Sequence, residues 1–560
     1  MCRPLSCGPH MAWLIRNIKR GMVMRITHHG TISESFPVVR TKYGRVAGET
    51  TEGVAVFRGI PYGGRCDRDR RFLPAKEPEC WDGVMDCTQN GPICVQTAGS
   101  SSDFYATGGH PEKLKLQYET QSENCLCLNV LTPGLDQKKR PVMVYIHGGG
   151  YSILSGTILT GADKLAREQD MVLVSMNHRL HVFGYLYLGG LDERYLDSGN
   201  VGQLDLILAL KWVRDNIEQF GGDPDCVTII GESGGSDKVL TLTHMPEAKG
   251  LFHRAIAISC FLPVGRITPD VATGYAEEAL HLLSVSPSHL DKLLELPARY
   301  ITEKIFHPDT HFWSMTFAPV SDGIHLGRGA GDGFIPAFDN GHIPLILGAS
   351  EDEMASFVLE DGLDITEENF RTKALERGKK YGLNITEQNV DALLDAFRET
   401  NCKMDPADHL FMKMISIRCH MGCAQYPAED YALHQRETPV YLYLNRYDVP
   451  HGRYPYRRFA GHCTELSPFF RMVAYPEMEE YSKTVANLFA SFMRTGKPEA
   501  SGLRWPRFDM LQKATMVFDR KFSVVSDPLR IEQEALDSIT GPKAITNAFS
   551  HNEYKFPLNY

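Results

Sequence analysis

The chain has 560 residues, of which 43% are hydrophobic and 23% are charged, and its formal net charge is -10. These proportions are ordinary for a globular protein and exclude a fibrous or fully disordered chain. The excess of acidic residues gives no electrostatic reason to expect nucleic acid as a partner. No apolar run reaches the length of about 18 residues that a membrane-spanning helix needs. We therefore expect neither a nucleic-acid partner nor a membrane span, and the sequence leaves the oligomeric state open.

The N-terminal region lacks the pattern of a secretory signal. Apolar residues at Met11–Ile15 are followed at once by basic residues, so no apolar core of about 7 residues forms. The predicted location is therefore the cytoplasm, with secretion as the less favoured alternative. Residues 1–37 precede the first regular pattern and are predicted to be an extension that can be disordered. Residues 38–560 are predicted to form a single domain.

The first elements along the chain are predicted to be strands and one long helix. Short strands bounded by glycine and charged residues come first, and buried strands of the kind found in parallel sheets follow. Apolar residues then recur at helical spacing between Asn200 and Phe220, before two glycines that end the helix. The predicted strands are, in order, Val38–Thr41, Gly44–Glu49, Gly53–Phe57, Pro141–Ile146, Met171–Met176 and Cys226–Ile230.

Two further buried strands, Ile343–Gly348 and Val440–Leu444, are separated by a mostly helical stretch. No linker rich in proline, glycine or serine interrupts that stretch, so its helices are predicted to cap the sheet within the same domain. Their expected ranges are Glu367–Tyr381, Asn389–Arg398 and Ala407–Ala424. Strands that alternate with helices in this way indicate an α/β protein with a large, mostly parallel central sheet flanked by helices.

The run Gly-Glu-Ser-Gly-Gly at residues 231–235 directly follows the predicted strand Cys226–Ile230. A serine between glycines is common in surface turns, but a strand immediately before it is what a nucleophile elbow needs. The sharp turn holds the serine in strained backbone geometry, and the flanking glycines leave room for it. Ser233 is therefore the predicted nucleophile.

A serine hydroxyl is a poor nucleophile, so it needs a base that takes its proton and an acid that orients the base. In this architecture both come from later strands, in the chain order nucleophile, acid, base. Glu353 follows the strand Ile343–Gly348, and His462 follows the strand Val440–Leu444. These two residues are the predicted acid and base. Glu351, Asp352 and Asp448 remain rival acids, and His451 remains the rival base.

The run His-Gly-Gly-Gly-Tyr at residues 147–151 follows another buried strand. Successive glycines let a backbone turn its amides toward one point, which is the arrangement that stabilises the oxyanion of acyl transfer. The amides of Gly149 and Gly150 are predicted donors to this oxyanion. The amide of Gly234, directly after the nucleophile, is predicted to be the third.

Taken together, these motifs resemble the type B carboxylesterases, the family of the cholinesterases and carboxylesterases, and its bacterial members in particular. The resemblance covers about Val38 to Arg530. It implies an α/β-hydrolase fold with helical cap insertions, and hydrolysis of a small-molecule carboxylic ester through an acyl-enzyme intermediate. It implies no cofactor and no metal ion. Besides the glycine-rich motifs, the runs that carry it are Phe57–Tyr62, Glu123–Asn129, Ser198–Gly202, Phe220–Pro224 and Pro319–Gly323.

The resemblance also favours particular site residues. The family's acid is a glutamate in a Gly-x-x-x-Asp-Glu pattern, which matches residues 348–353 and favours Glu353. The family's histidine precedes a short acidic and apolar run similar to the one that follows His462. The chain departs from the family at Gly234, where alanine is usual, and in segment 63–71, which is rich in Arg and Asp.

Secreted relatives close a loop with a disulfide that matches Cys94 and Cys125. In the cytoplasm we expect free thiols at these positions, because that compartment keeps thiols reduced. Cholinesterases carry a choline-binding tryptophan within this loop, and residues 95–124 contain none. Recognition of a quaternary amine by an aromatic face is therefore not supported.

Aromatic residues near the motifs fit a substrate pocket and a packed core equally well; they are Tyr151, Phe317, Phe104 and Tyr105. An alternative function is that of a catalytically inactive, cholinesterase-like adhesion or binding protein. Such relatives typically lose a residue of the triad, whereas all three positions are filled here. The sequence therefore favours an active serine esterase and leaves its natural substrate open.

Overall fold

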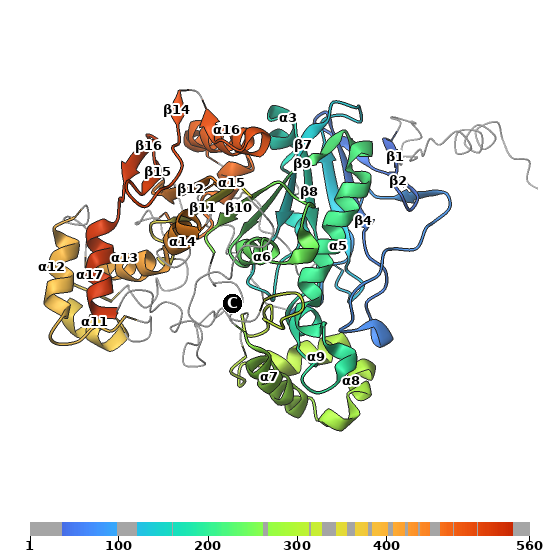
Figure 1. Cartoon of the computed structure of the whole chain (residues 1–560), viewed down its shortest axis with the longest axis horizontal. Coiled ribbons are helices and arrows are strands. Elements are labelled where there is room, and N and C mark those ends of the chain that lie inside the picture. Colours follow the sequence, from blue (N-terminus) through green and yellow to red (C-terminus); the bar gives the residue numbers. More distant parts are fainter. Residues whose placement is uncertain are drawn as a thin grey trace, which may run out of the picture.

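Figure 1 shows the computed structural model of the chain. The structure describes residues 36–97, 120–159, 161–260, 267–312, 315–327, 343–355, 364–378, 383–400, 407–420, 424–434, 437–448, 460–473, 475–500 and 502–540. Nearly all of the predicted extension 1–37 lies outside these residues. The rival base His451 and the aromatic residues Phe104 and Tyr105 also lie outside them.

An 11-stranded sheet runs through the molecule in the spatial order β16-β15-β12-β11-β10-β9-β7-β8-β6-β4-β3 (Figure 1). Neighbouring strands are parallel from β15 to β8 in this order, and antiparallel pairs lie toward the two edges. The predicted α/β class with a large, mostly parallel sheet is thus confirmed. The strands of this sheet are β3 (Glu49–Thr51), β4 (Val54–Pro61), β6 (Cys127–Thr132), β7 (Arg140–Ile146), β8 (Val172–Met176), β9 (Gly222–Glu232), β10 (Arg254–Ile258), β11 (Leu345–Ser350), β12 (Val440–Asn445), β15 (Ala514–Phe518) and β16 (Ser523–Ser526).

Smaller sheets and the helices complete the described fold. Strands β1 (Val38–Arg40), β2 (Arg45–Ala47) and β5 (Val84–Asp86) form one small sheet, and β13 (Glu499–Ala500) pairs with β14 (Leu503–Arg504). The α-helices are α3 (Asp163–Glu168), α4 (His181–Tyr185), α5 (Val201–Asn216), α6 (Gly234–Leu242), α7 (Pro269–Leu282), α8 (Asp291–Glu295), α9 (Ala298–Ile305), α11 (Phe370–Gly378), α12 (Val390–Arg398), α13 (Ala407–His420), α14 (Tyr426–His434), α15 (Leu466–Phe469), α16 (Glu479–Thr495) and α17 (Arg530–Thr540).

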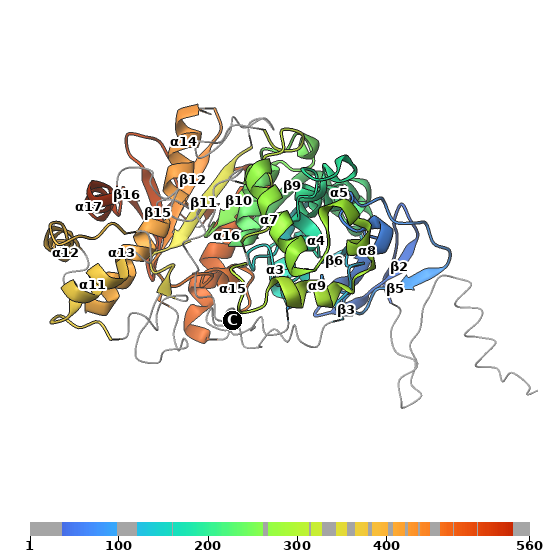
Figure 2. The same ribbon diagram turned by 90° about the horizontal axis from the view of Figure 1, so that it is seen from below.

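The parallel strands bury side chains on both faces, because each strand sends alternate residues to opposite sides. In β7, Val142 and Val144 belong to one apolar core, whereas Met143 and Tyr145 belong to the other. Helices α5, α6, α13 and α14 add to the first core, and α3, α15 and α16 add to the second. Figure 2 shows α14 and α16 on opposite sides of the sheet. Burial on two faces explains why these strands read as continuous apolar runs in the sequence.

The helices predicted between the last two parallel strands are present as α11, α12 and α13. They pack on one another and on α17 beyond β15 and β16 (Figures 1 and 2), and α13 also contacts β11. Leu393 and Phe397 of α12 belong to the same apolar core as Val142. The insertion therefore shares the core of the sheet.

One predicted strand was shorter than the observed strand, whereas the predicted long helix agrees with the observed helical segment. The predicted strand Cys226–Ile230 is part of β9, which begins at Gly222 and ends at Glu232. The predicted helix Asn200–Phe220 is α5 followed by a 3-10 turn, Ile217–Phe220, that ends at the left-handed residue Gly221. Polar residues at the ends of β9 hid its full length, because pairing with β7 at Gly222 and with β10 at Glu232, and not side-chain character, extends the strand there.

Cys94 and Cys125 are both buried free thiols. A hydrogen bond with Cys94, together with burial, raises the pKa of the Cys125 thiol well above its ordinary value. Both side chains belong to the first apolar core, so the pair acts in this structure as part of that core. None of the helices in the described ranges has both the length and the apolar character that a membrane crossing requires.

Candidate active site

All of the predicted site residues follow the carboxyl ends of strands in the parallel block. Ser233 follows β9, Glu353 follows β11, His462 comes after β12, and the glycine-rich run 147–151 follows β7. In the sheet, β9 lies next to β7, and β11 lies next to β12. Loops that leave neighbouring parallel strands at the same end converge at one edge of the sheet, so this topology gathers the predicted residues.

Ser233 occupies a strained turn between β9 and α6. Its backbone has φ 55° and ψ -129°, a conformation that costs an L-residue energy. The amide of Ser233 donates to the carbonyl oxygen of Ile258 at 2.9 Å, which ties the turn to β10. A Cβ on Gly231 would lie 2.2 Å from the carbonyl oxygen of Gly235, and a Cβ on Gly235 would lie 2.1 Å from that of Ile146. The glycines on either side of Ser233 are therefore required sterically.

Glu353 and His462 form the central contact of the site. The Oε2 atom of Glu353 lies 2.5 Å from Nδ1 of His462, and both side chains are buried. The other carboxylate oxygen, Oε1, accepts a hydrogen bond from the amide of Ser350 at 2.7 Å and another from the hydroxyl of Ser259. These contacts hold the carboxylate in one orientation, so it can fix the tautomer and the direction of the imidazole ring.

The rival acids are engaged elsewhere. Glu351 accepts a hydrogen bond from Nε of Arg446 at 2.9 Å and lies 3.6 Å from Nζ of Lys413. Asp352 contacts Nε2 of His409 at 3.2 Å, and Asp448 pairs with an exposed arginine at 3.3 Å. Three consecutive acidic residues thus point to three different partners, and Glu353 is the one that contacts His462.

His462 lies among three buried carboxylates. Its Nε2 atom is 3.1 Å from Oε1 of Glu232, the residue before the nucleophile. Burial alone would lower the pKa of His462, but the charges of Glu353 and Glu232 raise it above the ordinary value of 6.5. Burial would raise the pKa of Glu353, yet the charge and hydrogen bond of His462 and the donors Ser259 and Ser350 lower it. The carboxylates on either side of the imidazole therefore oppose the effect of burial and stabilise its protonated form.

Sequence reasoning missed the third of these carboxylates, Glu465. It accepts a hydrogen bond from the hydroxyl of Tyr443 at 2.9 Å and another from the hydroxyl of Ser350 at 3.1 Å. Burial and then the charge of Glu353 raise its pKa to about 7. Its place in the run after His462 was a signal, but nothing in that run tells whether the side chain points inward.

The glycine-rich loop after β7 has the backbone conformation that its glycines permit. Gly149 has φ 78° and Gly150 has φ 60°, both in the left-handed region. Within the described residues, neither amide donates to a backbone or side-chain acceptor. A Cβ on Gly149 would lie 2.4 Å from the carbonyl oxygen of Ile153, so the loop also needs glycine there sterically. These two amides remain available to a bound oxyanion.

A buried lysine supports this loop from behind, and sequence reasoning missed it as well. Nζ of Lys238, on α6, donates to the carbonyl oxygen of Gly150 at 2.8 Å and to that of His147 at 3.3 Å. Burial lowers the pKa of Lys238 to about 7, against the opposing charges of Asp237 and Glu232. The signal in the sequence that could have identified Lys238 was the presence of a lysine in the helix that follows Ser233. Its contacts tie the glycine-rich loop to the helix that follows Ser233.

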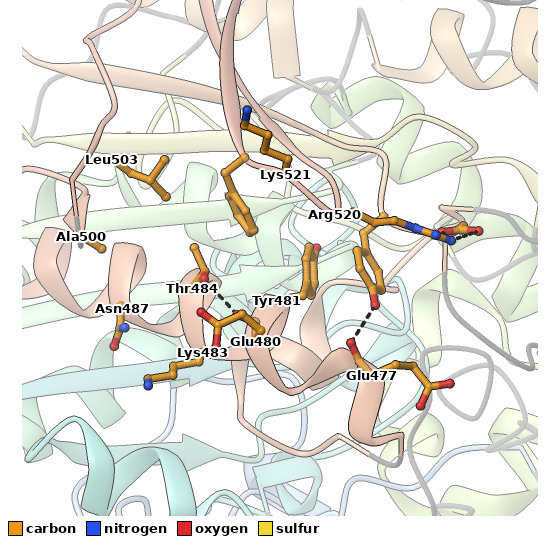
Figure 3. A pocket seen from close by; sticks show the side chains of 13 residues that line it. Glu477, Glu480, Tyr481, Lys483, Thr484, Asn487, Ala500, Leu503, Arg520 and Lys521 are labelled. Carbon is orange, nitrogen blue, oxygen red and sulfur yellow. Dashed lines mark hydrogen bonds and ion pairs between the residues drawn. The ribbon is translucent and has the colours of Figure 1, made fainter.

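A separate pocket of about 770 Å³ opens beside α16 (Figure 3). The rings of Tyr447 and Tyr481 stack in its wall with their centroids 4.0 Å apart. Tyr481 donates to Asn445 at 2.8 Å, and Asn445 in turn donates to Ser350 at 3.0 Å. None of the predicted catalytic residues lines this pocket, and these hydrogen bonds connect its wall to Ser350, which contacts Glu353. The lining residues are Tyr447, Asp448, Glu477, Glu480, Tyr481, Lys483, Thr484, Asn487, Ala500, Leu503, Arg520, Lys521 and Phe522.

Comparison with known proteins agrees with this geometry. A model of the carboxylesterase family matches residues 35–536. The chain is 32% identical to the para-nitrobenzyl esterase of Bacillus subtilis over 508 residues, which are 88% of this chain and 96% of that protein. It is 31% identical to the liver carboxylesterase of Sus scrofa over 543 residues, which are 89% and 92% of the two chains.

Solved structures of esterases match as well. A carboxylesterase of Geobacillus stearothermophilus superposes with a TM-score of 0.73 at 30% identity, covering 89% of this chain and 99% of that one. An esterase of Clostridium hathewayi that can hydrolyse aliphatic aromatic polyesters superposes with a TM-score of 0.72 at 29% identity, covering 92% and 100%. The similarity therefore extends over nearly the whole described fold.

Proposed function

This chain belongs to the carboxylesterase family and is a carboxylic ester hydrolase with the α/β-hydrolase fold, and we propose that Ser233, Glu353 and His462 are its catalytic triad. The observation that carries the proposal is the 2.5 Å contact between Oε2 of Glu353 and Nδ1 of His462. It occurs in a buried site at the strand edge from which Ser233 also projects. The inactive, adhesion-type alternative has no support from the relatives, which are named esterases.

In the proposed mechanism, the hydroxyl oxygen of Ser233 attacks the ester carbonyl carbon while Nε2 of His462 takes the hydroxyl proton. Glu353 stabilises the imidazolium that forms and keeps Nδ1 protonated. His462 then gives the proton to the departing alcohol, which leaves an acyl group on Ser233. A water molecule attacks this acyl-enzyme by the same route and restores the serine.

The oxyanion of each tetrahedral intermediate is proposed to bind the amides of Gly149, Gly150 and Gly234. Preorganised amides act at the point where negative charge develops, and removal of one such donor costs about 10²- to 10³-fold in kcat. The left-handed backbone at Gly149 and Gly150 and the support of that loop by Lys238 favour this role.

The test of the nucleophile is covalent labelling. A fluorophosphonate probe should form one adduct, and peptide mass spectrometry should locate it on Ser233. Incubation with a hydrolysable ester should slow the labelling, because both compete for the same hydroxyl. An adduct on any other serine, or no adduct in an enzyme that hydrolyses esters, would overturn the assignment.

The substrate class is proposed to be small carboxylic esters without a quaternary amine. The para-nitrobenzyl esterase relative supports an aromatic alcohol as one accepted leaving group. Tyr151 and Phe317 are almost fully buried, so they support the core more than they supply an open aromatic face. Comparison of p-nitrophenyl, benzyl and choline esters of one short acid separates these classes. Preference for the choline ester would contradict the proposal.

The substitution Gly234→Ala is expected to lower kcat although alanine is usual at this position in the family. A Cβ here would lie 2.1 Å from the carbonyl oxygen of Gly150 and 2.5 Å from its Cα. Both atoms are backbone, so the oxyanion loop must move, and we expect a loss of about 10²-fold, the cost of one oxyanion donor.

The matched control is Gly274→Ala in α7, where a Cβ would meet no atom within 4 Å. That variant should keep its esterase rate and be slightly more stable, because alanine favours a helix by up to about 1 kcal/mol over glycine. Steady-state kinetics of both variants provide the measurement. Equal rates for Gly234→Ala and the parent would show that the loop accommodates alanine.

The substitution Glu232→Gln is expected to move the acid limb of the pH profile to lower pH. Catalysis needs neutral His462, so activity is lost as the pH falls through the pKa of His462. The negative charge of Glu232 helps to raise that pKa above 6.5, and glutamine removes the charge without changing the size. In kcat/KM measured against pH, Asp352→Asn should leave the limb in place, because Asp352 contacts His409. A limb that stays fixed in Glu232→Gln would contradict this role.

A further inference from the structure

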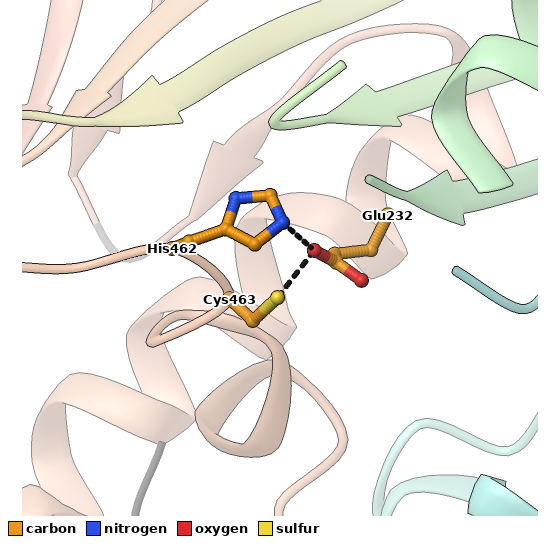
Figure 4. A group of neighbouring side chains, drawn as sticks. All are labelled: Glu232, His462 and Cys463. Atoms are coloured by element: carbon orange, nitrogen blue, oxygen red, sulfur yellow. Dashed lines mark hydrogen bonds and ion pairs between the residues drawn. The ribbon is translucent and has the colours of Figure 1, made fainter. Parts of the chain in front are cut away.

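Three side-chain atoms of kinds that bind metal ions lie close together beside Ser233. They are Oε1 of Glu232, Nε2 of His462 and Sγ of Cys463, and all lie within 4.8 Å of one another (Figure 4). The Nε2 and Oε1 atoms are 3.1 Å apart, and the thiol of Cys463 donates to the same Oε1. In the described ranges of the chain, no other group of three such residues converges in this way.

The spacing of these atoms suits a tetrahedral ion with nitrogen, oxygen and sulfur ligands. Zn²⁺ binds imidazole nitrogen and carboxylate oxygen at about 2.1 Å and thiolate sulfur at about 2.3 Å, so its ligand atoms lie about 3.5 Å from one another. The observed separation of Nε2 and Oε1 is close to this value. The contact between Sγ and Oε1 is shorter and would open by rotation of the Glu232 carboxylate.

The backbone at Cys463 is strained. Cys463 has φ 67°, in the left-handed region where glycine is favoured over a residue with a side chain. A side chain held at such a cost is a reason to look for a role at this position. The strained backbone directs the thiol toward Glu232, beside the catalytic histidine.

The charge around these atoms favours a divalent cation. Glu232, Glu353 and Glu465 are buried carboxylates whose charges all act on His462. Lys238, the cation of α6 whose charge interacts with Glu232, donates its hydrogen bonds to the carbonyl oxygens of Gly150 and His147. A thiol among the ligands selects soft or borderline ions such as Zn²⁺ over Mg²⁺ or Ca²⁺.

We propose that Glu232, His462 and Cys463 form an inhibitory binding site for a thiophilic divalent cation such as Zn²⁺. On binding, the S–H bond of Cys463 breaks and its proton leaves to solvent, a proton carried by Nε2 of His462 leaves in the same way, and the thiolate, the carboxylate and Nε2 each donate an electron pair to the ion. The ion takes the lone pair with which His462 would accept the proton of Ser233. Ester hydrolysis therefore stops while the ion is bound.

The proposed ligands are more deeply buried than the proposed nucleophile. Ser233, which adjoins Glu232 in the chain, is half-buried, whereas the three ligands themselves are almost fully buried. A bound ion and ester hydrolysis both need Nε2 of His462, so the inhibition rests on the proposed function. Occupancy of the site can still be measured without any turnover.

The first test measures inhibition of the full-length enzyme by ZnCl₂ with a chromogenic short-chain ester. The parent enzyme should be inhibited reversibly, with recovery on addition of EDTA. Cys463→Ser keeps a hydrogen-bond donor to Glu232. In this variant the half-inhibitory concentration of Zn²⁺ should rise more than about 10-fold, because mutation of a residue that only supports a metal ligand already lowers metal affinity by about that factor. Each variant is compared with its own metal-free rate.

The matched control is Cys226→Ser, which removes a partly exposed thiol within β9, closer to the start of the strand than Glu232. It should be inhibited like the parent enzyme. Equal inhibition of the parent and Cys463→Ser, or no inhibition of the parent by millimolar Zn²⁺, would overturn the proposal.

A second test uses Co²⁺ as a spectroscopic probe and needs no activity. Titration of the Ser233→Ala protein, which keeps all three ligands, should produce a thiolate-to-cobalt charge-transfer band that saturates at one ion per chain. The band should be missing from the double variant with Cys463→Ser. If Cys463→Ser does not fold, Cys463→Ala replaces it. Absence of the band from the Ser233→Ala protein is by itself enough to refute the site. Because this readout is independent of hydrolysis, it also separates failure of the metal site from failure of the triad.

Discussion

Ser233→Ala should lower kcat for a chromogenic ester by on the order of 10⁴-fold or more, because removal of the nucleophile from a serine hydrolase leaves only the oxyanion hole and substrate binding. Alanine lacks the attacking oxygen but keeps the Cβ that the elbow already accommodates at φ 55°. The backbone strain is therefore unchanged, and thermal unfolding should give a similar midpoint. Single-turnover measurements with excess enzyme would reveal whether any acyl-enzyme still forms.

The neighbouring Ser236 provides the control for this prediction. Its hydroxyl donates to the carbonyl oxygen of Ser233 within the first turn of α6, so it is committed to the helix. Ser236→Ala should therefore retain most of the activity and all of the labelling by a fluorophosphonate. If Ser236→Ala loses activity and labelling while Ser233→Ala retains both, the nucleophile is Ser236 and not Ser233.

Glu353→Gln should lower kcat by about 10⁴-fold, the loss seen when the acid of a serine protease triad becomes an amide. The local hydrogen bonds make the outcome specific. The amide of Ser350 can only donate, so it holds the oxygen of the new side chain where Oε1 of Glu353 lies. The amide nitrogen then faces Nδ1 of His462, which must accept a hydrogen bond. His462 consequently carries its proton on Nε2 and cannot take the proton of Ser233.

Comparison with Glu351→Gln tests whether this loss belongs to Glu353. Glu351 is two residues away and pairs with Arg446 and Lys413, so its amide variant should keep an activity within about 10-fold of the parent, as expected for a residue remote from the chemistry. Circular dichroism and thermal unfolding establish that both variants fold. Comparable activity of Glu353→Gln and the parent would exclude Glu353 as the orienting acid.

Much of the fold was predictable because it rests on local patterns. Strands buried on both faces have apolar side chains in succession, as in β7 and β8, and turns that need a left-handed backbone have glycine, as at Gly149 and Gly150. The ends of β9 were not predictable, since pairing with the neighbouring strands β7 and β10 sets them. The cytoplasmic location and the disorder of residues 1–37 stay predictions.

The sequence by itself determined the family, the order of Ser233, Glu353 and His462, and the glycine-rich loop, because each depends on residue types at short spacing. It left three consecutive acidic residues as candidate partners for His462, and only the tertiary structure separated them, by the direction in which the loop after β11 turns each side chain. The structure also decided that Glu232, Cys463 and Glu465 lie around His462. Such contacts join residues of different strand ends, and no local pattern records which loops meet at the edge of a sheet.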